Sequence, residues 1–248
     1  MSIQTNPDLR RSVIYELYVR SHTPQGTFRA VEPDLPRIRA LGTDILWLMP
    51  IHPIGQENRK GSMGCPYANR DYRTVNPEYG TLEDFLHLVD AIHDNGMKCI
   101  IDVVYNHTYN TDGSNFERTV PGYFYRQKPD GSLANGSACG NETASNRPMM
   151  RKYMIESVLH WIKEYHIDGF RFDLMGIHDI ETMNEIRKAV SAVDPSIIIY
   201  GEGWAAEAPQ YPGDSLAMKV NTCKMPGIAA FSDEMRDALR GPFNDNHK

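Results

Sequence analysis

Short apolar runs alternate along the chain with segments of helical periodicity. Apolar residues at three- and four-residue spacing predict helices over 35–41, 85–92, 150–162 and 183–190, and a charged segment at 232–239 predicts the start of another helix. Thr81 and Asp84 resemble a capping box before the second of these helices, and Gly96 follows its end. The apolar runs predict strands at Ser12–Val19, Thr43–Pro50, Met97–Val104, Ile167–Leu174 and Ile197–Gly201, with a weaker strand at Ile228–Phe231.

Repeated strand–helix units indicate an α/β fold with a parallel sheet. Two architectures fit, an open doubly wound sheet and a (β/α)8 barrel. The open sheet favours a glycine-rich phosphate turn after the first strand, and SHTPQG (21–26) is not one. Ionisable and polar residues instead follow successive strands, at the end where (β/α)8 barrels build their active sites. They are Asp102, Asn106, His107, Arg171, Asp173 and Glu202.

We therefore predict a (β/α)8 barrel over residues 1–248 that holds strands one to six of eight. The segment 108–148 is rich in turn motifs and predicts a long loop or small subdomain inserted after strand three. Loops of this length in compact domains are usually functional.

Composition and charge narrow the classes of partner. The net charge of −6 argues against nucleic acid and anionic membranes, whereas neutral sugars are indifferent to it. The four cysteines form no CxxC pair, so a zinc site is not indicated. The N-terminus lacks the apolar stretch of a signal peptide, and no segment is apolar for long enough to span a membrane. We expect a cytoplasmic protein.

Asp173 and Glu202 follow adjacent predicted strands, so their carboxyl groups are expected about 5–6 Å apart, the spacing of a retaining glycosidase. Arg171 lies two residues before Asp173 and points to the same face of its strand. A cation there keeps Asp173 ionised and orients it. A buried Arg171–Asp173 ion pair without catalysis is the alternative interpretation at this point.

Three motifs resemble the first three signature regions of the α-amylase superfamily, glycoside hydrolase family 13. They are DVVYNH (102–107), GFRFDLMGIHD (169–179) and GEGW (201–204). Tyr67 and the following NRDYRTVNPEYGT are similar to the family's segment after strand two. The resemblance implies a nucleophile at Asp173 and a general acid/base at Glu202. It also implies that Tyr67, His107 and Arg171 bind the sugar that is cleaved.

Within the family, the chain from Tyr105 onward resembles type I pullulanases, through VPGYFYR, NGSACGNETAS and PSIIIYGEGW. The first 100 residues resemble bacterial α-amylases more closely, and the pullulanase-type segment YNWGYDP is absent. The resemblance implies an enzyme that hydrolyses α-glucans such as starch, glycogen or pullulan. It favours cleavage of α-1,6 branches, with α-1,4 cleavage as the alternative.

Four further residues have secondary roles in this interpretation. The resemblance implies that Asp102 supports Arg171. Trp204 is a candidate to stack on a glucose ring or, alternatively, a rim residue that packs on its loop. His178 is a candidate substrate contact or a loop hydrogen bond. Asn106 aligns with a calcium ligand of many α-amylases, but calcium needs six to eight oxygens and only this one is visible. We therefore predict no cofactor, and calcium remains the one candidate.

The family also uses a third acid, an Asp in an HD motif after strand seven. The terminal residues 244–247 contain no such motif in the right context. The chain therefore looks truncated at its C-terminal side, and we expect it to be poorly stable and weakly active by itself. An inactive or glucan-binding fragment is thus the alternative of a different class.

Overall fold

The computed structural model describes residues 7–57, 59 and 61–241, so the terminal residues 244–247 lie outside the described part. Six parallel strands form one sheet in the order β1-β2-β3-β4-β5-β6. Consecutive strands are thus always neighbours, as in six successive units of a (β/α)8 barrel. The strands are β1 (Ile14–Leu17), β2 (Ile45–Leu48), β3 (Lys98–Val103), β4 (Gly169–Phe172), β5 (Ile198–Gly201) and β6 (Ala229–Ala230).

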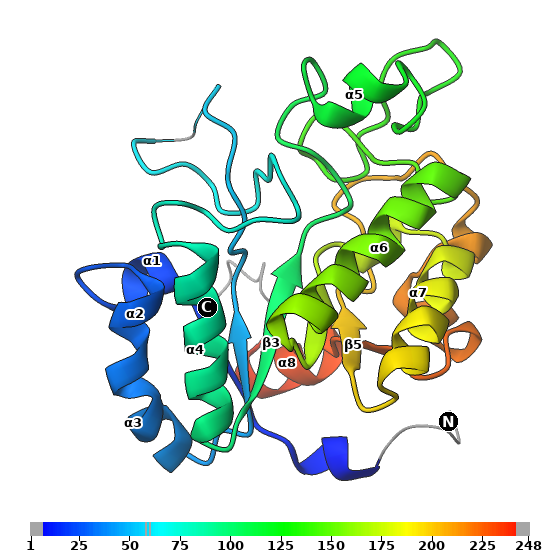
Figure 1. Ribbon diagram of the computed structural model, residues 1–248. Coiled ribbons are helices and arrows are strands. Elements are labelled where there is room, and N and C mark those ends of the chain that lie inside the picture. The colour runs from blue at the N-terminus through cyan, green and yellow to red at the C-terminus, as the bar shows by residue number, and fades with distance from the viewer. Residues whose placement is uncertain (1–6, 58, 60, 242–248) are drawn as a thin grey trace.

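Helices connect the strands on the outside of this half-barrel, and the strands point toward the end where the loops and α5 lie (Figure 1). The α-helices are α1 (Val19–His22), α2 (Phe28–Val31), α3 (Leu35–Ala40), α4 (Leu82–Asp94), α5 (Asn115–Thr119), α6 (Pro148–Tyr165), α7 (Ile180–Val193) and α8 (Asp233–Arg240). Short 3-10 helices are Pro7–Arg11, Glu32–Asp34, Met175–Ile177, Gly213–Ser215 and Lys219–Lys224. Within the described residues, no helix is both long and apolar enough to pass through a bilayer.

Alternation along the strands divides the apolar side chains into two clusters. Residues such as Leu46, Ile101 and Phe170 pack against the helices in the larger cluster. The smaller cluster lies on the inner face and consists of Ile45, Trp47, Ile100, Ile198 and Tyr200. Because side chains two apart share a face, Asp102 and Arg171 also point inward, and β3 and β4 pair with these two residues in register.

The predicted elements are all present, with shorter strands than expected. The predicted strand Ser12–Val19 is β1 only at Ile14–Leu17, because the chain turns into α1 at Val19. Thr81 and Asp84 form the predicted capping box, in which each side chain accepts a hydrogen bond from the other residue's backbone N–H.

The segment 108–148 lies over the strand ends and contains α5 and two isolated antiparallel bridges, Tyr125 with Thr143 and Gln127 with Leu133. Both partners of a buried ion pair within this segment also hydrogen-bond to the barrel loops. Arg126 Nη1 lies 2.7 Å from Glu142 Oε1 and donates to the carbonyl of Ile177, beyond β4. Glu142 Oε1 also accepts from the N–H of Gln210, beyond β5. The inserted segment thus contacts the loops that follow both of these strands.

Candidate active site

The guanidinium of Arg171 lies between three carboxyl groups at the carboxyl ends of β3, β4 and β5. Its Nη1 is 2.7 Å from Asp173 Oδ1 and 3.0 Å from Asp102 Oδ1. Its Nη2 is 2.7 Å from Glu202 Oε1. Arg171 is 5% exposed, so these charge-assisted contacts are shielded from water. The structure therefore brings the predicted carboxylate pair together around one cation.

Asp173 is held at both of its carboxylate oxygens. Oδ1 accepts from Arg171, and Oδ2 accepts from the side-chain amide of Asn106 at 2.9 Å. The backbone N–H of Asp173 donates to the carbonyl of Val103, which continues the pairing of β3 and β4 beyond the strands. Leu174 then takes a left-handed conformation, with φ of 39°, so the chain turns sharply after the carboxylate.

That turn also positions Glu202. The backbone N–H of Leu174 donates to Glu202 Oε2 at 2.9 Å, while Oε1 contacts Arg171. The preceding residue is glycine, and a Cβ at Gly201 would lie 2.6 Å from the carbonyl oxygen of Phe172. Close approach of β4 and β5 therefore requires the glycine that precedes Glu202 in the motif GEGW.

Burial raises the pKa of Glu202, although the Arg171 charge opposes that shift. Burial likewise raises the pKa of the fully buried Asp102, again against the charge of Arg171. Three carboxyl groups share one guanidinium here, so full ionisation would leave two negative charges uncompensated in a buried site. The site therefore favours retention of a proton, and Glu202 is a carboxyl group that can deliver one.

His107 has a defined tautomer. The amide nitrogen of Asn106 donates to two oxygens of Asp173, so its Oδ1 must accept from His107 Nδ1, 2.6 Å away. Burial lowers the pKa of His107 and keeps the ring neutral. Nδ1 therefore carries the hydrogen, and Nε2 is left as an acceptor for a ligand.

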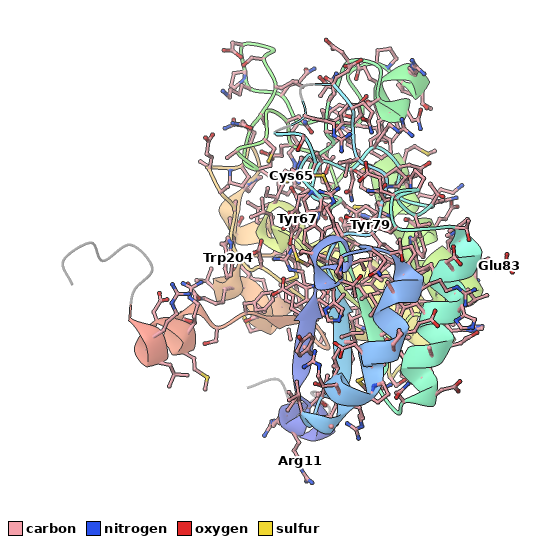
Figure 2. The ribbon with its side chains drawn as sticks, turned by 90° about the vertical axis from the view of Figure 1, so that its left-hand side faces the viewer. Arg11, Cys65, Tyr67, Tyr79, Glu83 and Trp204 are labelled. Atoms are coloured by element: carbon pink, nitrogen blue, oxygen red, sulfur yellow. The ribbon has the colours of Figure 1, made fainter. Side chains whose placement is uncertain are left out.

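Aromatic side chains surround the guanidinium. The hydroxyl of Tyr67 donates to Asp102 Oδ2 at 3.3 Å, and the guanidinium carbon of Arg171 is 5.9 Å from the centre of the Tyr67 ring. Trp204 is half-buried, and its ring centre is 6.3 Å from that of Phe231. Figure 2 shows Tyr67 and Trp204 at the boundary between the strands and the loops above them.

Sequence reasoning misses two contributors to the site. The guanidinium carbon of Arg171 lies 5.2 Å from the Trp47 ring and 5.8 Å from the Phe231 ring, within the range of cation–π attraction. The place of Trp47 in an apolar strand indicates only a core residue. Phe231 directly follows β6, just as Asp173 and Glu202 follow β4 and β5, and this position is the signal that could have identified it.

The structure buries His178, which the sequence makes a candidate for a substrate contact or a loop hydrogen bond. Its ring is fully buried, and its centre is 6.2 Å from that of Phe172. Burial, together with the nearby charge of Arg126, lowers its pKa to about 3, so the ring is neutral. Its backbone N–H donates to Met175, and its carbonyl accepts from Ala217. Neither ring nitrogen has a hydrogen-bond partner among the described residues, so the predicted loop hydrogen bond is not formed by the ring in this conformation.

Asn106, the candidate calcium ligand, contacts protein groups at both ends of its side chain. Its amide nitrogen donates to Asp173, and its oxygen lies 2.6 Å from His107 Nδ1. Among the described residues, no cluster of three or more His, Cys, Asp or Glu side chains could hold a metal ion. The amide instead orients the carboxylate of Asp173 and the ring of His107.

Comparisons with known proteins find one matching family and several similar proteins. The α-amylase catalytic-domain family matches residues 7–131. A pullulanase of Bacillus subtilis (strain 168) is 43% identical over 154 residues, which are 62% of this chain and 21% of that protein. Pullulanase A of Streptococcus pneumoniae is 29% identical over 269 residues, which are 94% of this chain and 20% of that protein.

Two solved pullulanases are also similar. That of Paenibacillus barengoltzii, in complex with maltohexaose and α-cyclodextrin, has a TM-score of 0.86 and 41% identity, covering 94% of this chain and 41% of its own. That of Anoxybacillus sp. LM18-11, complexed with maltotriose, has a TM-score of 0.89 and 33% identity, covering 97% and 39%. The chain thus spans about a fifth of the curated relatives' length. With its half-barrel and its carboxylate pair, the chain belongs to the α-amylase family of glycoside hydrolases.

Proposed function

We propose that this chain supplies the nucleophile and the general acid/base of a retaining, pullulanase-like hydrolase that cleaves α-1,6 branches in α-glucans. The observation that carries the proposal is the bridging of Asp173 and Glu202 by Arg171 at 2.7 Å on each side. One guanidinium between two carboxyl groups favours the short separation of retaining enzymes, about 5–5.5 Å, over the longer one of inverting enzymes.

In the first step, Asp173 Oδ2 or Oδ1 attacks the anomeric carbon while Glu202 donates its proton to the departing glycosidic oxygen. Arg171 orients the carboxylate of Asp173 at 2.7 Å, and burial raises the pKa of Glu202, which favours its protonated form. In the second step, Glu202 takes a proton from water, and the resulting nucleophile cleaves the glycosyl ester on Asp173. Two displacements at one carbon retain the α configuration.

The choice of the α-1,6 linkage rests on the similar proteins. Several of them are pullulanases, and each of these matches most of this chain's length. Neutral His107, with Nε2 as an acceptor, and the ring of Tyr67 suit the hydroxyl groups and C–H faces of a sugar. An α-glucan is therefore the substrate class that we assign to the site.

Digestion of pullulan by the protein from its complete reading frame tests the proposal. Cleavage of α-1,6 bonds releases maltotriose, whereas α-1,4 cleavage releases panose. Asp173→Asn and Glu202→Gln are expected to slow maltotriose release at least about 100-fold, and the exposed Asp112→Asn is the matched control. Panose as the product would contradict the proposed α-1,6 specificity. An unchanged rate of maltotriose release from both variants would contradict the proposed catalytic roles of Asp173 and Glu202.

A further inference from the structure

A pocket of about 300 Å³ lies between the segment after β2, the inserted segment and α6. Five of its fifteen lining residues are aromatic. The rings of Phe116 and Phe124 stack at 4.9 Å, and Tyr153 meets Phe116 edge-on at 4.9 Å. Tyr72 and Tyr109 complete the aromatic lining. The residues that line the pocket include none of those that surround Arg171, so it is a separate site.

A buried polar side chain without a partner also lines this pocket. Asn69 is 0% exposed, and within the described residues neither its Nδ2 nor its Oδ1 has a hydrogen-bond partner. A buried carboxamide left unpaired is unfavourable, so such groups in native proteins usually meet a ligand or a water. Asn69 needs a partner that both donates and accepts, which is the chemistry of a hydroxyl group or of two vicinal hydroxyl groups.

The charges around the pocket select a neutral occupant. Arg70 and Lys152 contribute two positive charges to the lining, and Asp71 and Glu156 contribute two negative charges. A phosphate or a carboxylate would meet no net attraction there. Aromatic walls instead suit the apolar C–H faces of a sugar ring, and the volume lies at the lower end of ligand pockets, which suits a mono- or disaccharide unit.

We infer that this pocket binds a glucosyl unit of an α-glucan chain, apart from the catalytic carboxyl groups. The identity of the sugar rests on the proposed function, and the pocket's need for a neutral polyol rests on Asn69 and its surroundings. Tyr72 joins the two sites, because its ring lines the pocket and its hydroxyl donates to the carbonyl of His107 at 2.8 Å. A second binding site for the same polysaccharide raises the effective concentration of the polysaccharide at the catalytic carboxyl groups.

The side chain of Met149 is a local reporter, because it lines the pocket and is 53% exposed. The test is a maltotriose titration of the protein, labelled with ¹³C at its methionine methyl groups, in a Glu202→Gln background that prevents hydrolysis. Met149→Leu assigns the signal. We expect the Met149 methyl resonance to shift on saturation, while that of Met235 on α8 stays in place.

Asn69→Leu removes the carboxamide, and Tyr153→Leu removes a ring of the wall. Each is expected to weaken the binding reported by Met149 about tenfold, since each removes one good contact. Tyr165→Leu, a half-buried tyrosine of the same helix outside the pocket, is the matched control and should leave that affinity unchanged. A Met149 signal that ignores maltotriose, or that responds with equal affinity in the two pocket variants, would mean that water fills the pocket and would overturn the inference.

Pullulan hydrolysis separates this inference from the proposed function. Asn69→Leu should raise the KM for the polysaccharide about tenfold and leave kcat unchanged, because the residue does not touch the catalytic carboxyl groups. Active enzyme with a silent Met149 would contradict the pocket alone. A responsive Met149 in a protein that releases no maltotriose would contradict the proposed reaction alone.

Discussion

The side-chain amide of Asn106 donates to both Oδ2 and the main-chain carbonyl of Asp173, each at 2.9 Å. These two bonds fix the carboxylate of Asp173 relative to its own backbone. The oxygen of the same amide accepts a hydrogen bond from His107 Nδ1. The orientation of the proposed nucleophile, Asp173, and the tautomer of His107, which is proposed to bind the sugar, therefore both depend on the side chain of Asn106.

Asn106→Ala is accordingly expected to lower kcat on pullulan about 100-fold, because a misplacement of roughly 1 Å at the nucleophile has an effect of that size. KM should change far less, since Tyr67 and Arg171 remain. Asn110→Ala is the control, because the side chain of Asn110 follows the same strand but donates to Glu57. Steady-state kinetics decide, and an unchanged kcat would contradict the positioning role.

Arg171→Met should destabilise the fold by about 3–5 kcal/mol at pH 7, because three carboxyl groups lose their buried counter-charge. Burial already raises the pKa of Asp102 and Glu202 in the folded state, and loss of the cation raises both further. The folded variant then binds more protons than the unfolded one, so its deficit should shrink as the pH falls.

Urea denaturation at pH 7 and pH 5 measures this deficit. Arg73→Met removes an exposed ion pair with Glu156 and should change the unfolding free energy by less than about 1 kcal/mol at either pH. A deficit in Arg171→Met that grows on acidification would show that the carboxyl groups are not the cause.

Glu202 should set the alkaline limb of the pH profile. Its pKa is raised by burial, so kcat/KM on pullulan is expected to fall as the pH rises through that elevated value and the acid loses its proton. Glu202→Gln should lose about 10²–10⁴-fold on pullulan and far less on α-maltotriosyl fluoride, because fluoride leaves without protonation. Equal losses on both substrates would rule out Glu202 as the proton donor.

The ion pair of Arg126 and Glu142 should matter for stability because both side chains are almost fully buried, at 5% and 0% exposure. Glu142→Gln leaves a buried guanidinium without its counter-charge and is expected to cost about 3–5 kcal/mol. Replacing both partners, with Arg126→Met and Glu142→Leu, should recover part of that loss. Thermal unfolding checks this, with Glu156→Gln on the surface of α6 as the control.

Strand periodicity is sufficient to predict the inner face of the site from the sequence. The two-residue alternation of parallel strands places four side chains on this face, those of Asp102, Arg171, Asp173 and Glu202. Because the strands are parallel, their carboxyl ends lie at one edge of the sheet, and the four side chains lie there together. The motif resemblance then implies roles that spacing alone leaves open between catalysis and a simple ion pair.

Contacts that depend on turns and on distant loops are not predictable in the same way. The Leu174 N–H reaches Glu202 only because the chain adopts a left-handed turn after Asp173. His178 follows the same strand in sequence, yet the 3-10 helix Met175–Ile177 carries it into the interior. The aromatic pocket around Asn69 joins three segments that are separated by tens of residues, so no local pattern reveals it.

The roles of Asp173 and Glu202, as the nucleophile and the acid/base of an α-1,6-glucan hydrolase, are tested most directly by the products of pullulan digestion. The measurement compares the protein from its complete reading frame with Asp173→Asn and Glu202→Gln. We expect maltotriose from the unmodified protein and release that is at least about 100-fold slower from either variant. Release of maltotriose from either variant at the rate of the unmodified protein, or panose in place of maltotriose, would contradict these roles.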